Sequence, residues 1–230
     1  MNQNANINAN YTKYYKDREH LRVYPNEFVV RTLLANYPDL RIRKPQAGDA
    51  ILDVAFGDGR NLVLLCDLGL DVYGIEITNE IVEQTGMRLA EMGYNPDLRV
   101  GRNSNIPFEN EKFSYILACH SCYYCDEGQV LLDNLREYRR VLKPDGILIA
   151  SVADKRSYIF KNAEYHSDGT MRIANDPYGN RIGYRLQGFS TEEEIENYFS
   201  ILFKKFSFGS ANNNYYGVHE QVFWVVCEKK

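Results

Sequence analysis

The sequence predicts an α/β protein with a parallel sheet, because short apolar runs alternate with helical patterns along the chain. The clearest stretch is 51–78, ILDVAFGDGRNLVLLCDLGLDVYGIEIT, in which one apolar run ends at Asp53 and a second ends at Glu76. A Gly57-x-Gly59 turn and a helical pattern lie between them. This order is a βαβ unit with an acid at the tip of each strand, where open parallel sheets bind their ligands.

The remaining elements follow from periodicity and turn residues. Strands are predicted at about 50–54, 71–76, 98–101, 114–119 and 146–152, and helices at about 26–36, 60–69, 79–92 and 128–141. Pro144-Asp145-Gly146 predicts a turn, since proline presets one φ and glycine permits a positive one. Ser190-x-x-Glu193 predicts a capping box that opens a helix reaching about Leu202. The tail predicts two strands, about 204–210 and 221–228, joined by a loop at 212–216.

The glycine turn and Glu76 together predict a site for an adenosine-like cofactor. Glycines let a ligand approach the backbone closely, and an acid at the second strand tip can accept two hydrogen bonds from a ribose diol. Dinucleotide sites use G-x-G-x-x-G to hold a pyrophosphate, but the third glycine position here is Leu62. The carboxylate of Asp53 would repel a pyrophosphate and suits a ligand with an ammonium group. These features indicate S-adenosyl-L-methionine; a nucleotide-dependent oxidoreductase and a bare tight turn are the alternatives.

The run Asp53-Val54-Ala55-Phe56-Gly57-Asp58-Gly59 resembles the first motif of the class I (Rossmann-like) S-adenosylmethionine-dependent methyltransferases. Ala55 stands where that family often has glycine. Segments 98–108, 113–125 and 135–151 are similar, in the same order, to the family's adenine loop, fourth strand and fifth strand. The resemblance implies a methyltransferase with a Rossmann-like, mostly parallel seven-stranded sheet, helices on both faces and an antiparallel last strand. The GRN run after the turn is also similar to the small tellurite-resistance-type methyltransferases.

The resemblance and the tyrosine-rich N-terminal segment imply which residues contact the cofactor. They are Tyr15, Asp53, Ala55, Gly57, Gly59, Asn61, Glu76, Ile77, Asn103, Ser104 and Cys119. Two positions depart from the family pattern: Arg102 stands where many relatives have an Asp that accepts from adenine, and Ser114 where many begin the fourth strand with Asp. An arginine accepts no hydrogen bond, so adenine is expected to rely on Asn103, Ser104 or backbone groups.

Two segments flank this pocket and are expected to build the acceptor site. Residues 11–36 predict an N-terminal lid whose tyrosines offer π faces to adenine or to a sulfonium; a surface helix packed on the sheet is the alternative. Residues 154–185 lack a sustained period and predict an insertion over the acceptor. Their six bases against four acids indicate a small polar, anionic acceptor gripped by Arg181 and Arg185; a solvated loop is the competing interpretation.

His120 is the predicted catalytic base, because it follows the strand that ends nearest to the transferred methyl group. General-base catalysis needs such a side chain within hydrogen-bond reach of the acceptor's proton. A structural histidine bonded to backbone is the competing interpretation, and His166 in the insertion is a second candidate base. The alternative function is a methyltransferase-like domain that binds the cofactor or a partner and transfers nothing.

Cys119, Cys122 and Cys125 lie in a C-x-x-C-x-x-C run with His120, a pattern that can ligate zinc or an iron–sulfur cluster. A closed metal site needs a fourth ligand and an irregular loop, whereas Cys119 ends an apolar strand and the sequence has no second cysteine pair. We therefore expect buried, reduced thiols and no metal.

The chain length and the net charge limit which partners and which location are expected. A chain of 230 residues predicts one domain, 1–230. The net charge of −4 without a basic tract predicts no nucleic-acid partner, and the lack of a long apolar run predicts no membrane partner. The start, MNQNANINAN, lacks the order of a signal peptide, so residues 1–10 predict a disordered tail and the chain a cytoplasmic location. The expected partner is a small-molecule substrate, and the oligomeric state stays open.

Overall fold

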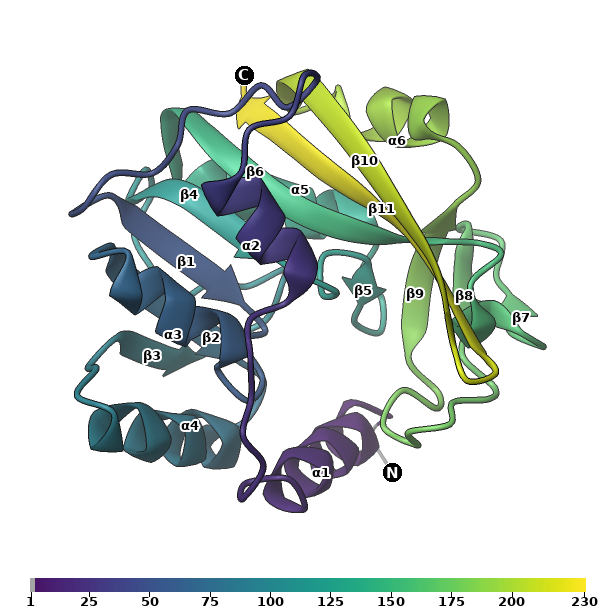
Figure 1. Ribbon diagram of the computed structural model, residues 1–230. Coiled ribbons are helices and arrows are strands. Elements are labelled where there is room, and N and C mark those ends of the chain that lie inside the picture. Colours follow the sequence, from purple (N-terminus) through teal and green to yellow (C-terminus); the bar gives the residue numbers. More distant parts are fainter. Residues whose placement is uncertain (1–2) are drawn as a thin grey trace.

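A mixed sheet forms the centre of the molecule in the computed structural model, which describes residues 3–230 (Figure 1). Its parallel part contains β1 (Ala50–Val54), β2 (Asp71–Glu76), β3 (Asp97–Val100), β4 (Phe113–Ala118) and β6 (Leu142–Asp154). These strands lie in the order β3-β2-β1-β4-β6. β11 (Val218–Lys229) pairs antiparallel with β6, and β10 (Phe203–Tyr215) pairs antiparallel with β11. The predicted Rossmann-like α/β fold with an antiparallel edge is confirmed.

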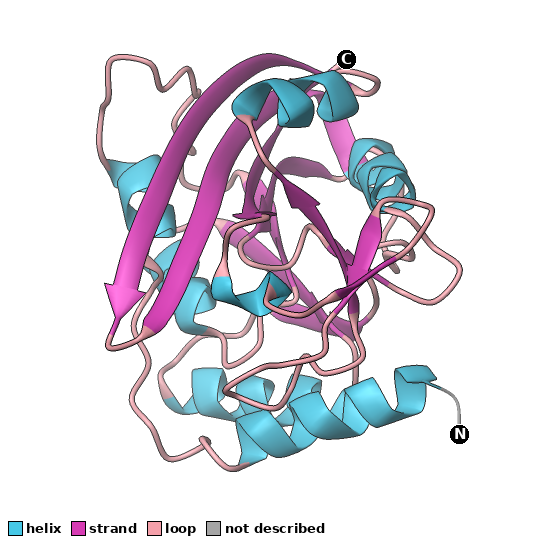
Figure 2. Cartoon of the chain, turned by 90° about the vertical axis from the view of Figure 1, so that its right-hand side faces the viewer, coloured by secondary structure: helices cyan, strands magenta, loops and turns pink. Residues whose placement is uncertain are grey.

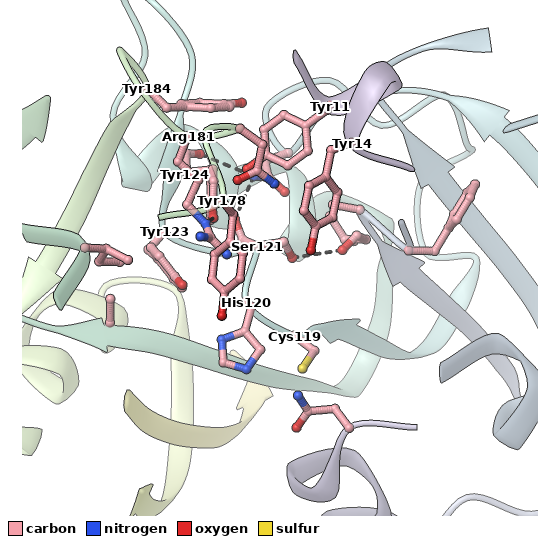
Figure 3. A pocket seen from close by; sticks show the side chains of 18 of the residues that line it. Tyr11, Tyr14, Cys119, His120, Ser121, Tyr123, Tyr124, Tyr178, Arg181 and Tyr184 are labelled. Atoms are coloured by element: carbon pink, nitrogen blue, oxygen red, sulfur yellow. Dashed lines mark hydrogen bonds between the residues drawn. The ribbon is translucent and has the colours of Figure 1, made fainter. Parts of the chain in front are cut away.

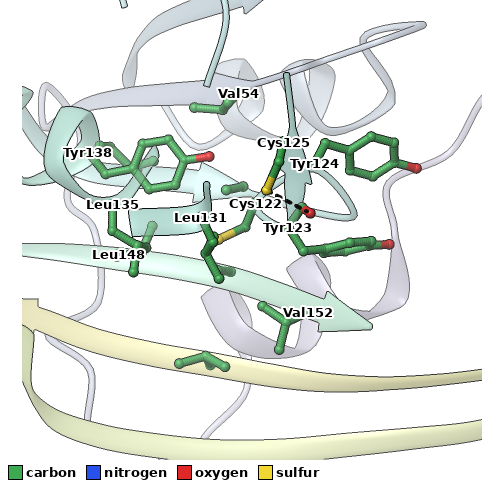
Figure 4. Packing of buried hydrophobic residues seen from close by; sticks show 14 of the residues in the cluster. Val54, Cys122, Tyr123, Tyr124, Cys125, Leu131, Leu135, Tyr138, Leu148 and Val152 are labelled. Carbon is green, nitrogen blue, oxygen red and sulfur yellow. Dashed lines mark hydrogen bonds between the residues drawn. The ribbon is translucent and has the colours of Figure 1, made fainter. Parts of the chain in front are cut away.

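Helices cover both faces of the sheet, because successive residues of a strand point to opposite sides. Ile51 and Leu52, neighbours on β1, belong to two separate apolar clusters. Helices α2 (Glu27–Leu34), α3 (Arg60–Asp67) and α4 (Asn79–Glu91) close the cluster of Ile51. Helices α5 (Leu131–Val141) and α6 (Glu192–Phe199) close the cluster of Leu52, in which Leu131 and Leu135 gather near Leu148 of β6 (Figure 4). Burial on both faces explains why the parallel strands are continuous apolar runs.

β6 begins earlier than predicted and contains the Pro144-Asp145-Gly146 run that we expected to form a turn. Its register with β4 shifts between the Phe113–Leu142 and Tyr115–Ile147 pairs, so the segment bulges within the strand. The positive φ falls on Asp145, at 56°. Gly146 is required for a different reason, since a Cβ there would lie 2.8 Å from the carbonyl oxygen of Lys143.

The hairpin of β10 and β11 is longer than predicted. Pairing continues to Tyr215 and Val218, so the loop expected at 212–216 shrinks to a turn at Tyr216 and Gly217. Both turn residues have positive φ, 53° and 96°, which is the type I′ geometry that matches strand twist. The polar residues before the turn were expected in a loop because the end of this hairpin is largely exposed and offers no apolar alternation to read.

The insertion adds short strands that the sequence analysis did not predict. They are β7 (Glu164–Tyr165), β8 (Thr170–Arg172) and β9 (Arg185–Phe189), with η1 (Tyr158–Phe160) before them and β5 (Tyr124–Cys125) pairing with β9. β9 also pairs in parallel with the end of β6. The sheet therefore has eleven strands across residues 3–230 rather than the seven expected. Strands this short carry too few residues for a period to be visible.

The cap of α6 lies one residue later than the predicted box. Thr191, rather than Ser190, accepts the backbone N–H of Glu194 at 3.1 Å. The Glu194 carboxylate in turn accepts the N–H of Ser190 at 2.8 Å. The sequence alone fits either capping box, because two hydroxyl residues and two acids stand next to each other at the required spacing. The helix ends at Phe199, before the predicted end at Leu202.

A helix, α1 (Gln3–Lys16), replaces the disordered tail expected for residues 1–10, of which 1 and 2 lie outside the described residues. It lies along one end of the molecule (Figure 2). Ile7 is buried in the cluster of Leu52, and Asn8 accepts a 2.7 Å hydrogen bond from Nη2 of Arg102. These tertiary contacts hold an asparagine-rich segment whose own helix propensity is low.

The hairpin turn permits a paired test of stability. Gly217→Ala is expected to lower the free energy of unfolding by about 1–2 kcal/mol, because an L side chain at φ 96° is strained. Gly86→Ala, a matched control within α4, is expected to raise it by about 0.5–1 kcal/mol, because its methyl group meets no atom within 4 Å and alanine favours helix. Urea denaturation followed by circular dichroism measures both values. Shifts of the same sign would contradict the turn geometry.

Candidate active site

The loop after β1 is a tight turn in which Ala55, Gly57 and Gly59 all have positive φ, at 58°, 58° and 71°. A Cβ on Gly59 would lie 2.7 Å from Cγ2 of Thr85 on α4. The Thr85 hydroxyl donates a 2.9 Å hydrogen bond to the carbonyl of Gly57. Ala55 adopts the left-handed region in spite of its Cβ, at a cost of about 1 kcal/mol. The loop therefore has a fixed shape at the carboxyl end of β1, with Gly59 opening α3.

Glu76 is the acid at the tip of β2, and its side chain is buried. Its Oε1 accepts the N–H of Gly57 at 3.0 Å, and its Oε2 accepts the N–H of Ile77 at 2.7 Å. Burial raises the pKa of this carboxyl to about 7, although the two amide bonds act in the opposite direction. Each oxygen keeps a lone pair for a further donor, such as a hydroxyl of a diol.

The helix α1 lies over the glycine loop. A Cβ added to Gly57 would overlap the hydroxyl of Tyr15. The hydroxyls of Thr12 and Thr78 are 3.0 Å apart, and Nε2 of Gln84 donates to the carbonyl of Tyr15 at 3.2 Å. These bonds tie α1 to the start of α4, so the tyrosines of the segment 11–36 reach the site from α1. The other helix of that segment, α2, packs on the sheet instead.

A cavity of about 360 Å³ runs from this loop to the end of β4. Seven of the residues expected to contact the cofactor line it: Tyr15, Ala55, Asn61, Glu76, Ile77, Asn103 and Cys119. His120 and Arg181 line its other end. One continuous space therefore joins the predicted cofactor residues to the predicted base, which is the arrangement that a transfer reaction needs.

Four expected contact residues, Asp53, Gly57, Gly59 and Ser104, do not line this cavity. The two glycines shape the loop. Asp53 is 1% exposed, and its Oδ2 has no hydrogen-bond partner within residues 3–230. Burial, together with Glu76 nearby, raises the pKa of Asp53 well above its usual value. Asp53 is therefore buried behind the loop and does not line the cavity.

Asn103 lines the cavity, but its side chain is already engaged. Its Nδ2 donates to the carbonyls of Ser121 and Tyr124 at 2.9 and 3.2 Å, and its Oδ1 accepts the hydroxyl of Tyr138 at 2.8 Å. Nearby, Arg102 is paired with Asp126 at 2.8 Å. The amide of Asn103 is therefore not free to bind adenine.

His120 lies directly after β4 with φ 55°, and its backbone N–H donates to Oγ of Ser151 at 2.8 Å. The ring itself has no hydrogen-bond partner within the described part of the chain. Burial lowers the pKa of His120, although Glu220 acts in the opposite direction. The ring is therefore neutral at pH 7 and able to accept a proton. Figure 3 shows it at one end of a group of tyrosines that includes Tyr178.

Tyrosines dominate the cavity wall. They are Tyr11, Tyr14, Tyr15, Tyr123, Tyr124, Tyr158, Tyr178, Tyr184 and Tyr215. Among them lies Arg181, whose Nε donates to Tyr124 at 2.8 Å and whose Nη1 lies 3.1 Å from a carboxylate oxygen of the buried Asp176. Of the bases that the sequence places in the insertion, Arg181 alone among the described residues lines this cavity. Arg185 instead contacts Asp168 and Thr170, so its predicted role in gripping the acceptor is wrong.

The lining residues that the sequence analysis did not name include Asn180, Tyr215 and Glu220. Tyr215 and Glu220 come from the far end of the β10–β11 hairpin. They also line a second cavity of about 620 Å³ between α2 and the hairpin, which shares His120 with the first. No local pattern marks these residues, because only the length of the hairpin carries them to the site.

The cysteines are separate thiols. Cys122 and Cys125 are buried in the cluster of Leu52, while Cys119 lines the cavity. Burial raises the pKa of Cys125 to about 12, which disfavours the thiolate that a metal needs. Within residues 3–230, no group of three or more His, Cys, Asp or Glu side chains is placed to hold a metal ion.

Residues 52–150 match the methyltransferase domain family. YqeM of Bacillus subtilis (strain 168), named as a candidate methyltransferase, is 25% identical over 177 residues, which span 77% of this chain and 68% of YqeM. An S-adenosylmethionine-dependent methyltransferase from Methanosarcina mazei has a similar fold, with a TM-score of 0.61 and 18% identity over 91% of this chain and 99% of that chain. Another from Thermotoga maritima has the same TM-score and identity over 97% and 99%.

The fold, the glycine loop with its acid on β2, and the match over the parallel strands point to one class of protein. Residues 52–150 are similar to the methyltransferase domain family, and the fold is that of the class I (Rossmann-like) S-adenosylmethionine-dependent methyltransferases. This similarity indicates a methyltransferase, for which S-adenosyl-L-methionine is the expected cofactor. The finer likeness to the tellurite-resistance-type methyltransferases stays a prediction. No helix within residues 3–230 is long and apolar enough to cross a membrane.

The pKa of Glu76 predicts how cofactor affinity depends on pH. A ribose diol donates to the carboxylate and so favours its charged form, whereas burial keeps about half of the free protein protonated near pH 7. Affinity for adenosine is therefore expected to rise from pH 5.5 to 8.5, by up to tenfold for each unit below about 7. Calorimetry in two buffers of different ionisation enthalpy should show proton release. Glu76→Gln should bind more weakly with a flat profile; an unchanged profile would remove the ribose assignment.

The position of Tyr15 over Gly57 predicts a graded pair of variants. Gly57→Val should abolish binding of S-adenosylhomocysteine, because a branched side chain at φ 58° both strains the loop and displaces Tyr15. Tyr15→Phe, which removes only the hydroxyl, should retain binding within about tenfold. Calorimetry measures both, with circular dichroism as the control for folding. Full binding by folded Gly57→Val would show that the cofactor does not lie across this turn.

Proposed function

We propose that the enzyme transfers a methyl group to a small polar molecule bound between His120 and Arg181. The continuous cavity from Glu76 to His120 carries this proposal, because it joins both ends of a transfer reaction within one space. The residues present fit the cofactor: Glu76 has lone pairs free for a ribose diol, and Ala55 and Ile77 line the cavity with it. S-adenosylmethionine supplies an activated methyl group on its sulfonium.

The protein's part in the reaction is alignment and proton removal. The cavity walls position the acceptor's nucleophilic atom in line with the transferred carbon and exclude water. His120 is neutral and its ring is free of hydrogen bonds to residues 3–230, so it can take a proton from the acceptor. Its backbone bond to Ser151 fixes the residue in the left-handed region without using the ring.

The acceptor's anionic character is proposed on Arg181 alone. The surplus of bases in the insertion is offset locally, because Arg156 pairs with Asp154 at 2.5 Å and Arg185 pairs with Asp168. Arg181 is itself paired with Asp176, which leaves Nη2 as its nitrogen without a hydrogen bond to the described residues. We propose that this nitrogen holds an oxygen atom of the acceptor, such as one from a carboxylate.

Two measurements test this function. Calorimetry should show binding of S-adenosylhomocysteine to the purified protein. Incubation with S-adenosylmethionine carrying a labelled methyl group should transfer label to small molecules in a metabolite extract. Binding of the cofactor together with label transfer to macromolecules alone would contradict the proposal of a small acceptor.

His120→Asn is expected to lower turnover by roughly 10²–10⁴ with little change in cofactor affinity. Asparagine suits the test, because it tolerates the positive φ at this position better than alanine does. His219→Asn, on an exposed neighbour of Glu220, is the matched control and should turn over normally. Single-turnover assays with the best extracted acceptor measure the rate. Normal turnover by His120→Asn would assign His120 a structural role.

A further inference from the structure

Each charged side chain that lines the cavity has a partner within residues 3–230, either an opposite charge or backbone amides, with one exception. Asp58 pairs with Arg60 at 2.5 Å, and Arg102 pairs with Asp126 at 2.8 Å. Arg181 is balanced by Asp176 at 3.1 Å. Glu76 accepts two backbone amides at the cofactor end.

The exception is Glu220, whose carboxylate has neither a hydrogen bond nor an ion pair within residues 3–230. It lies on β11 at the boundary between the two cavities, where it shares the lining with His120 and Tyr215. An uncompensated carboxylate in a partly enclosed space favours a cation. The net charge at the acceptor end of the cavity is therefore negative, although the insertion contains more basic than acidic residues.

A second, independent feature indicates a ligand that donates a hydrogen bond. Asn180 is 4% exposed and lines the same cavity, and its Oδ1 has no hydrogen-bond partner among the described residues. A buried carbonyl oxygen without a donor is unfavourable, so a donor from the ligand would stabilise the complex. Tyr123, Tyr158 and Tyr178 supply aromatic surface around it, which attracts a cation through its π faces.

We propose that the acceptor is an amine whose ammonium group is bound by Glu220, so that the enzyme methylates nitrogen. This inference rests on the proposed function and extends it, because Arg181 can hold an oxygen group at the other end of the same molecule. An amine that carries a carboxylate would satisfy both groups.

The reaction balances with the residues present. The bound ammonium loses one proton to the neutral ring of His120 and becomes an amine with a free electron pair. The amine nitrogen then forms the N–C bond as the bond from methyl carbon to sulfur breaks, and that bond's electron pair stays on sulfur. The products are a methylated ammonium group and S-adenosylhomocysteine, and the imidazolium of His120 releases its proton to solvent.

A two-by-two panel of acceptors tests the inference. Each set shares one skeleton (alkyl, phenyl or indole) and varies the nucleophile between amine and hydroxyl, with or without a carboxylate at the far end; phenethylamine, 4-(2-aminoethyl)benzoate, 2-phenylethanol and 4-(2-hydroxyethyl)benzoate form the phenyl set. Label transfer from S-adenosylmethionine and calorimetric binding to the protein loaded with S-adenosylhomocysteine are measured. The amine members should be preferred over the hydroxyl members. Preference for hydroxyl members, or binding of no amine in any set, overturns the inference.

Glu220→Gln supplies the matched variant, since it keeps the shape and removes the charge. The KM for the best amine should rise by roughly 10- to 100-fold, while affinity for S-adenosylhomocysteine stays unchanged. Glu193→Gln, on the exposed surface of α6, is the control and should leave KM unchanged. An unchanged KM in Glu220→Gln contradicts the role of Glu220. Failure of the wild-type protein to bind S-adenosylhomocysteine would instead contradict the proposed function, so the two outcomes are distinct.

Discussion

The buried carboxylate of Glu76 is the interaction on which the cofactor end of the site depends. It accepts the amide of Gly57 from the loop after β1 and the amide of Ile77 beside it, so it fixes one strand tip against the next loop. Two amide bonds do not fully replace the water that the carboxylate has lost, and its pKa therefore rises to about 7. A buried carboxylate with unused lone pairs is a poor structural group but a good receptor, because a diol supplies the donors that the protein leaves out.

The same loop couples the cofactor end to α1. Tyr15 stands over Gly57, while Thr12 and Asn8 contact Thr78 and Arg102 on the segments that follow β2 and β3. The helix is thus attached to two sides of the cavity through side-chain bonds of modest strength, about 0.5–1.5 kcal/mol each. The sheet, in contrast, is held by continuous backbone ladders and two apolar clusters. A weakly attached helix over a rigid sheet is the arrangement that lets a ligand enter the cavity between them.

The sequence predicts those structural elements that depend on residues close together in the chain. The strands from Ala50 to Ala118 and helices α3 and α4 lie where periodicity places them, because burial on both faces or on one stripe leaves a clear pattern. Positions set by distant contacts were missed. The helix α1 has no strong local signal and forms through Ile7 and Asn8, and Glu220 reaches the site only because the hairpin is longer than its polar tip suggests. The position of Asp53 at the tip of β1 was predicted correctly, but the burial that raises its pKa is not visible from spacing.

The acceptor end shows why a sum of charges over a segment is a weak guide to a binding site. The insertion carries more bases than acids, yet Arg156, Arg181 and Arg185 each contact an acid of the same segment. A paired charge has little field beyond its partner, whereas the carboxylate of Glu220 has no such partner within residues 3–230. Selection of the acceptor therefore depends on which group is left without a partner, and that is decided by β11, a strand far from the insertion in the sequence.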